Sequence, residues 1–100
     1  MRVALCTCPP EAADRLAGVL LEAGAACVNV LPAVVSHYVW EGAMQREAES
    51  LLVVKVAAER VEGVHAALRA AHPYQLPEWV VLAVDHDLTG SDYRRWVRGA

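Results

Sequence analysis

The segment Ser36-His37-Tyr38-Val39-Trp40-Glu41-Gly42 says more about the fold of this chain than any other stretch of its sequence. Side chains alternate between the two faces of a strand, so Tyr38 and Trp40 share one face. The closing Glu-Gly pair is typical of a turn between two strands. A second segment, His72-Pro73-Tyr74-Gln75-Leu76-Pro77-Glu78, sets an imidazole, a phenol and a carboxylate around two prolines. The two segments together indicate a site, an interface, or both.

The extended pattern continues on both sides of the first segment and predicts a long hairpin. Residues 25 to 42 form one predicted strand, in which Pro32 cannot donate to a ladder and so marks a bulge or an edge. After a turn around residues 42 to 46, residues 48 to 56 are strand-like again. At about 3.3 Å per residue, the first strand spans on the order of 55 Å, against about 20 Å for a strand of six residues. We therefore expect the hairpin to overhang its sheet.

The remaining periodic segments predict two more strands and three helices. Apolar residues at helical spacing predict the helices, and short continuous apolar runs predict buried strands. These elements are a strand from Arg2 to Thr7, a helix with an apolar stripe from Ala13 to Leu21 that stops before Gly24, a helix from Val61 to Ala71, a buried strand from Trp79 to Val84, and a short helix that carries Tyr93 and Trp96.

The order β-α-β-β-α-β is that of the ferredoxin-like sandwich, an α+β fold in which two helices cover one face of an antiparallel sheet. Right-handed crossovers give the strand order 4-1-3-2. One hundred residues are enough for one domain, which we place at residues 1–100. The exposed edges and the aromatic rings of Tyr38 and Trp40 on the overhanging hairpin favour pairing with further copies of the chain, which makes these two residues interface candidates.

Composition and charge argue against several classes of function. The net charge is −3 and the basic residues are scattered, so we expect no nucleic-acid partner. The apolar run from Val3 to Cys6 is too short for a signal-peptide core or a membrane span, so we expect no membrane partner and a cytoplasmic protein. Three cysteines are an odd number, which favours free thiols or metal ligands over a disulfide framework.

Taken in order, the motifs of this chain resemble those of the CutA divalent-cation-tolerance proteins over nearly its whole length. The resemblance implies a homotrimer similar to the PII signalling proteins, with hairpins packed between subunits. It also implies metal binding, copper above all, and a role in the response to metal ions. The matching pieces are Leu5-Cys6-Thr7, Ala25-Ala26-Cys27-Val28-Asn29, Pro32, Ser36-x-Tyr38-x-Trp40-x-Gly42, Glu49, Lys55, His72-Pro73-Tyr74-x-x-Pro77-Glu78 and Tyr93-x-x-Trp96.

A soft ion such as copper favours thiolate and imidazole ligands, so the candidates are Cys6, Cys8, Cys27 and His72. In this fold His72, just before the last strand, lies near the end of the first strand, where Cys6 and Cys8 are. The strand order places Cys27 at the other end of the same subunit. We therefore predict a metal site at Cys6 and His72, positions that the resemblance also implies, with Cys27 joining only across a subunit boundary. Plain core packing is the competing interpretation of each cysteine.

Two other classes of function stay open. A regulatory trimer similar to the PII proteins would bind a small ligand in a subunit cleft, with Lys55, Tyr74 and Glu78 as the cleft residues. A purely structural or anchoring trimer would need no cysteine at all. Lys55 and Glu78 are also candidates for a buried or interfacial ion pair. A hydrolase built on Cys27, His72 and Glu78 is disfavoured because the strand geometry separates Cys27 from His72, so we expect no enzyme.

Overall fold

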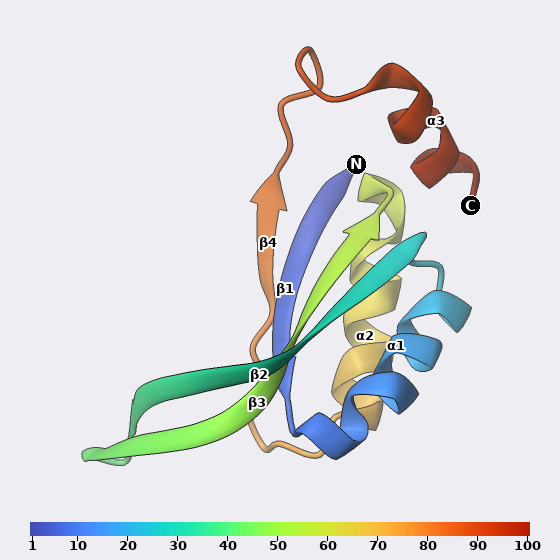
Figure 1. The fold of residues 1–100 in the computed structure, drawn as a ribbon. Coiled ribbons are helices and arrows are strands. Elements are labelled where there is room, and N and C mark those ends of the chain that lie inside the picture. The colour runs from blue at the N-terminus through green and yellow to red at the C-terminus, as the bar shows by residue number, and fades with distance from the viewer.

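The computed structural model describes all residues from 1 to 100 and has the predicted order of elements (Figure 1). One four-stranded sheet carries two helices on one face, and a third helix follows the last strand. The elements are β1 (Arg2–Cys8), the 3₁₀ helix η1 (Pro10–Ala12), α1 (Ala13–Glu22), β2 (Cys27–Trp40), β3 (Ala43–Val56), the 3₁₀ helix η2 (Ala58–Arg60), α2 (Val61–Ala71), β4 (Val80–Ala83) and α3 (Ser91–Gly99).

The sheet has the predicted order, β2-β3-β1-β4, and every neighbouring pair is antiparallel. Strand β1 therefore lies in the middle, with Leu5 opposite Val53 of β3 and Val80 of β4. The ferredoxin-like α+β arrangement predicted from the sequence is confirmed. No helix is both long enough and apolar enough to cross a membrane.

The core lies between the sheet and the helices α1 and α2. Leu16 and Leu20 of α1, and Val64 and Leu68 of α2, are fully buried. They belong to one cluster with the inward side chains of β1 and β3, which alternate with half-buried ones along β1 and along the part of β3 that pairs with it. No helix covers the opposite face of the sheet (Figure 1). That face carries Leu5 and Val53, among other apolar side chains, at intermediate exposure.

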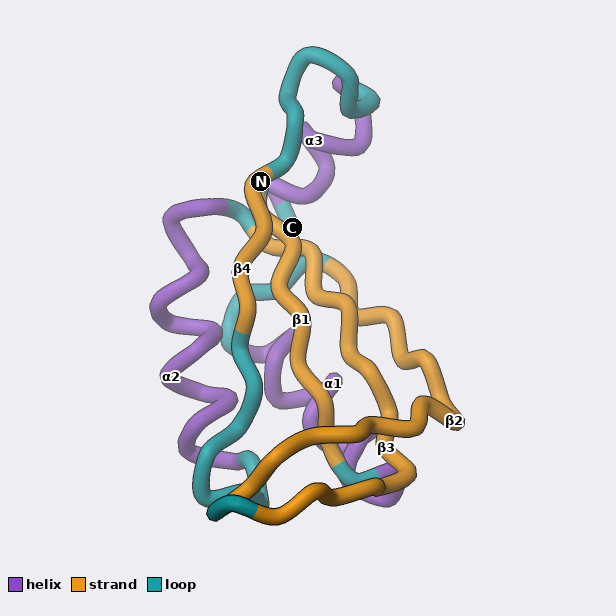
Figure 2. Tube along the Cα trace, turned by 90° about the vertical axis from the view of Figure 1, so that its left-hand side faces the viewer, coloured by secondary structure: helices purple, strands orange, loops and turns teal.

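The hairpin of β2 and β3 overhangs the sheet as predicted. Strand β1 ends at Cys8, opposite Ser50, whereas β2 and β3 stay paired from Val34 to Trp40 beyond that point. Both strands bend where they leave the sheet (Figure 2). The predicted irregularity near Pro32 is present as a register shift between Leu31 and Val34.

Two sequence predictions are wrong, one about the extent of the hairpin turn and one about the burial of the last strand. The hairpin turn does not span residues 42 to 46, because β3 begins at Ala43 and only Glu41 and Gly42, at φ 50° and 80°, form the turn. Two residues at positive φ close a hairpin without splaying its strands, so the ladder continues to the tip. The last strand is also not buried within the chain. Strand β4 is an edge strand whose four residues are all exposed.

Candidate functional site

A groove of about 980 Å³ opens where the hairpin leaves the sheet. One wall consists of side chains between Ser36 and Glu49, and the other consists of the segment from Pro73 to Val80. Thr7, near the end of β1, also lines it. The two segments that stood out in the sequence therefore face each other across one groove, although they are distant from each other along the chain.

His72 fixes the start of the second wall to the end of β1. Its Nε2 lies 2.8 Å from the Thr7 carbonyl oxygen, and its Nδ1 accepts a 3.0 Å hydrogen bond from the backbone N–H of Tyr74. Because Nδ1 is an acceptor, the ring is neutral and carries its proton on Nε2, which donates to Thr7. The side chain is buried, and both ring nitrogens are engaged. His72 is thus a positioning residue for the loop that follows it.

Two phenol–carboxylate pairs connect the groove residues. The Tyr74 hydroxyl donates a 2.7 Å hydrogen bond to Glu49 Oε2, and the Tyr38 hydroxyl donates a 2.9 Å bond to Glu47 Oε1. Burial, followed by the bond to Glu49, raises the pKa of Tyr74. The bond to Glu47 is the main cause of the raised pKa of Tyr38. Both phenols therefore stay protonated and act as donors.

The groove is acidic. Glu47, Glu49 and Glu78 line it, whereas no lysine or arginine does. Glu78 is an exposed residue, but partial desolvation of its carboxyl raises its pKa, and the negative charge of Glu49 raises it further. A cation placed here would reduce this repulsion between carboxylates, since opposite charge favours the ionised form.

The predicted thiol ligand is in the core rather than in the groove. Cys6 and Cys8 are fully buried and belong to the cluster that packs against the helices. Burial is the main cause that raises the pKa of Cys6 to about 12. The Cys6 thiol lies 3.5 Å from the Thr7 carbonyl oxygen, the same group that accepts from His72. The two predicted ligands are therefore at one end of the sheet, but no group of three or more potential metal-binding side chains assembles in the chain.

Cys27 and Lys55 lie at the other end of the sheet. They are opposite each other in the β2–β3 register, and Lys55 is also opposite Val3, whereas the groove residue Thr7 is opposite Leu51. Lys55 therefore does not join Tyr74 and Glu78 within one chain. No Lys55–Glu78 ion pair is present, since the one ion pair of the chain joins Arg95 and Asp92.

Several functional residues were not predicted from the sequence. The overhanging strand supplies Glu47 and Glu49 as acceptors for two tyrosines. The alternation of these two glutamates on one strand face was a visible signal for that role. A cavity lined by arginines of α3 was also not predicted. Its signal was three arginines within nine residues of an acidic chain.

The predicted interface aromatics are at the groove. Tyr38 and Trp40 both line it, and each is 39% exposed in the single chain. Trp79, on the opposite wall, stacks on His65 of α2 with ring centroids 5.1 Å apart, which holds this wall against the helix. Trp40 has no such partner ring within the chain.

Comparison with known proteins connects this fold and groove to one family. Residues 2–100 match the model of the family described as CutA1 divalent ion tolerance protein. The divalent-cation tolerance protein CutA of Citrobacter koseri is 40% identical in an alignment of 100 positions that covers 98% of this chain and 85% of that protein. The PII-like protein CutA of Nostoc sp. PCC 7120 superposes with a TM-score of 0.93 at 39% identity, covering 99% of this chain and 95% of the other. The divalent cation tolerance protein of Thermus thermophilus gives a TM-score of 0.92 at 35% identity over 99% and 97% of the two chains. This chain belongs to the CutA1 divalent ion tolerance family and has its PII-like fold.

Proposed function

We propose that this protein is a cytoplasmic homotrimer that binds divalent metal ions in the acidic groove and takes part in the response to metal ions. The observation that carries the proposal is a groove with three carboxylates, two phenols and no lysine or arginine, in a chain of a divalent ion tolerance family. Carboxylate oxygens are the ligands preferred by hard divalent cations.

Assembly completes the site in this proposal. One chain does not bring three metal-binding side chains together, so the remaining ligands come from a neighbouring copy or from water. The single chain leaves apolar surface that a second copy would cover: the open face of the sheet, the exposed edge strand β4 and the aromatic hairpin. Unpaired strand edges and large exposed apolar patches favour association.

The copper site predicted at Cys6 and His72 remains a prediction. Metal binding there costs more free energy than metal binding in the groove. Binding there requires the buried Cys6 thiol to lose a proton despite a pKa of about 12. It also requires one His72 nitrogen to leave its present hydrogen-bond partner. The groove needs neither change, because Glu47 and Glu78 are exposed carboxylates. For this reason we favour the groove.

We propose a binding role rather than catalysis. Cys27 is the only thiol outside the core, and it lies at the far end of the sheet from His72. His72 uses both nitrogens in backbone contacts and has none available as a general base. A nucleophile within hydrogen-bond reach of a base is the minimum for covalent hydrolysis, and this set lacks it.

Native mass spectrometry of the reduced protein tests assembly and metal uptake together. We expect a trimer that takes up a fixed number of Mn²⁺ ions. Glu47→Gln and Glu78→Gln should lose this uptake, while Glu62→Gln, at an exposed position of α2, is the matched control and should keep it. Uptake of Cu⁺ that is lost in Cys6→Ser and His72→Ala, but kept in the glutamate variants, would assign the site to the thiol–imidazole pair instead. A trimer with no discrete uptake of either ion would overturn the metal-binding proposal and favour a small-ligand or structural role.

A further inference from the structure

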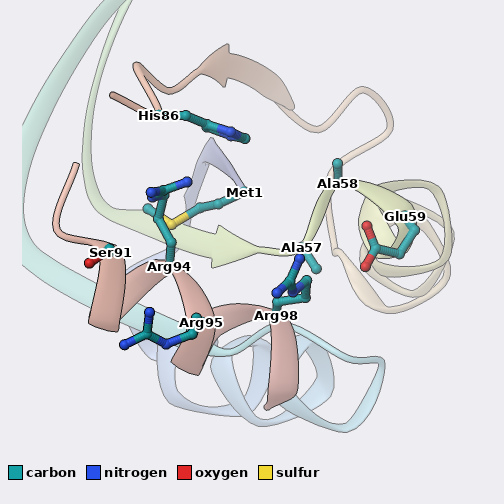
Figure 3. A pocket seen from close by; sticks show the side chains of 9 residues that line it. All are labelled: Met1, Ala57, Ala58, Glu59, His86, Ser91, Arg94, Arg95 and Arg98. Atoms are coloured by element: carbon teal, nitrogen blue, oxygen red, sulfur yellow. The ribbon is translucent and has the colours of Figure 1, made fainter. Parts of the chain in front are cut away.

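A second cavity, of about 340 Å³, lies beneath α3 (Figure 3). Met1, before the start of β1, lines it, whereas Thr7, near the end of β1, lines the acidic groove, so the two lie at opposite ends of the sheet. The second cavity is bounded by α3, by Met1 before β1, and by Ala57 and Ala58 where β3 leads into η2. Its volume is at the lower end of the range for small-molecule sites. The cavity shares no lining residue with the acidic groove, so a ligand here does not compete with a metal ion there for the same side chains.

Arginines dominate the lining. Arg94, Arg95 and Arg98 all come from α3, and Glu59 is the one carboxylate among the lining residues. Arg94 and Arg98 extend from α3 toward the cavity, whereas Arg95 points away from them (Figure 3). Arg95 pairs with Asp92 on its own helix. Two guanidinium groups therefore face the cavity without an ion-pair partner in the chain.

Arg94 also holds a polar atom that the protein leaves unsatisfied. Its Nε is buried and has no hydrogen-bond partner, the only such side-chain atom in the chain. A buried donor without an acceptor carries a desolvation cost, which a bound oxyanion removes when the Arg94 side chain turns to meet it. The Nε–H and one terminal N–H of a guanidinium form the fork that binds two oxygens of a single oxyanion.

The surroundings add donors and positive charge. Residues 91–100 hold three arginines and one aspartate, although the whole chain has a net charge of −3. Helix α3 begins at the cavity with Ser91, and no side chain caps its first turn, so backbone N–H groups there lack an intrahelical partner. His86, from the loop after β4, lines the same space.

From these observations we infer that the cavity beneath α3 binds a small molecule that carries phosphate groups. Arg94 and Arg98 hold the phosphate oxygens through their guanidinium groups, and Ser91 contributes its hydroxyl. Phosphate matches a site with several forked donors, because each phosphate presents three acceptor oxygens and a charge near −2. Glu59, the one carboxylate of the lining, opposes the binding of an anion.

Calorimetric titration of the intact protein with inorganic pyrophosphate at low ionic strength tests this inference. We expect saturable binding of one pyrophosphate per chain, weakened roughly tenfold by Arg94→Gln or Arg98→Gln through loss of a charge-assisted hydrogen bond. Arg69→Gln, at an exposed position of α2 away from the cavity, is the matched control and should bind like the parent. Glu59→Gln should bind more tightly than the parent, because it removes the opposing carboxylate.

The Arg94 Nε–H resonance gives a second readout that does not depend on affinity. We expect this signal to shift on addition of pyrophosphate in the parent and in Arg69→Gln, with the fold of each variant checked by circular dichroism. Binding that is equally weak in the parent and in all variants, or an Arg94 signal that stays unchanged at saturation, would overturn the site. Tighter binding of citrate than of pyrophosphate would overturn the assignment to phosphate.

Discussion

The hydroxyl of Tyr74 donates a 2.7 Å hydrogen bond to Glu49, a carboxylate that is only 4% exposed. The bond ties the loop after α2 to the hairpin at the point where β3 passes beyond β1. No lysine or arginine forms an ion pair with Glu49, so the phenol is its side-chain partner within the chain. The contact therefore holds the two walls of the acidic groove in one relative position.

Removal of this phenol is expected to destabilise the protein. Tyr74→Phe leaves a buried carboxylate without its donor, which should lower the free energy of unfolding by about 1 to 3 kcal/mol. Tyr38→Phe is the matched control, because its partner Glu47 is exposed and keeps its contact with water. Urea denaturation at one protein concentration measures both. An equal loss of unfolding free energy in the two variants would contradict the stabilising role given to the buried Tyr74–Glu49 pair.

The stability of the protein is expected to fall at alkaline pH because of Cys6. Burial raises the pKa of this thiol in the folded state from 9.0 to about 12. Between these values the unfolded chain releases the thiol proton and the folded chain keeps it, so stability decreases as pH rises. The contribution approaches about 1.4 kcal/mol per pH unit.

The measurement is the slope of unfolding free energy against pH above 9 for the parent and for Cys6→Ala. The variant should have a shallower slope, whatever its absolute stability. The comparison of slopes is the relevant one because Cys8 and Tyr74, whose pKa values are also raised, titrate in both proteins. Identical slopes would show that Cys6 ionises in the folded state as easily as in the unfolded one.

Trp40 is expected to contribute to assembly. Its ring is 39% exposed in the single chain, and it lies at the tip of a hairpin that extends beyond the sheet. If a neighbouring subunit covers this ring, Trp40→Ala removes packing of about 3 to 5 kcal/mol per chain. Native mass spectrometry on dilution should show that the variant dissociates at a higher protein concentration than the parent does.

Leu88→Ala, which truncates a side chain 85% exposed in the loop before α3, should behave like the parent. A Trp40→Ala assembly as resistant to dilution as the parent would refute the assignment.

Two glycines should respond to alanine in opposite ways. A Cβ at Gly42 or at Gly63 meets no atom within 4 Å, so neither substitution causes a clash. Gly42 has a φ of 80° in the hairpin turn, where alanine is strained by about 1 to 2 kcal/mol. Gly63 is in helix α2, where alanine should stabilise by about 0.5 to 1 kcal/mol. Thermal unfolding should give a lower melting temperature for Gly42→Ala and a higher one for Gly63→Ala. A change in the same direction would contradict the turn geometry.

Local sequence signals predicted most of the fold. Helical spacing of apolar residues gave α1 and α2, and the interruption at Pro32 predicted the register shift in β2. The errors concern β4 and the turn. A continuous apolar run indicates burial without saying what provides it, and β4 proved to be an exposed edge within one chain. The extent of the turn depended on two φ angles, which the composition of residues 42 to 46 did not reveal.

The order of the elements, the overhanging hairpin and the family could all be predicted from the chain alone, because they depend on periodicity and on the spacing of residues. The roles of the side chains, in contrast, follow only from the folded structure. It engaged both nitrogens of His72, buried Cys6 in the core and joined Tyr74 to Glu49 across 25 residues of sequence. It also turned two arginines of α3 toward one cavity. A side chain's pKa, its protonation state and its ability to bind a metal or ligand depend on which groups lie next to it in space. Strand register and helix packing determine which groups these are.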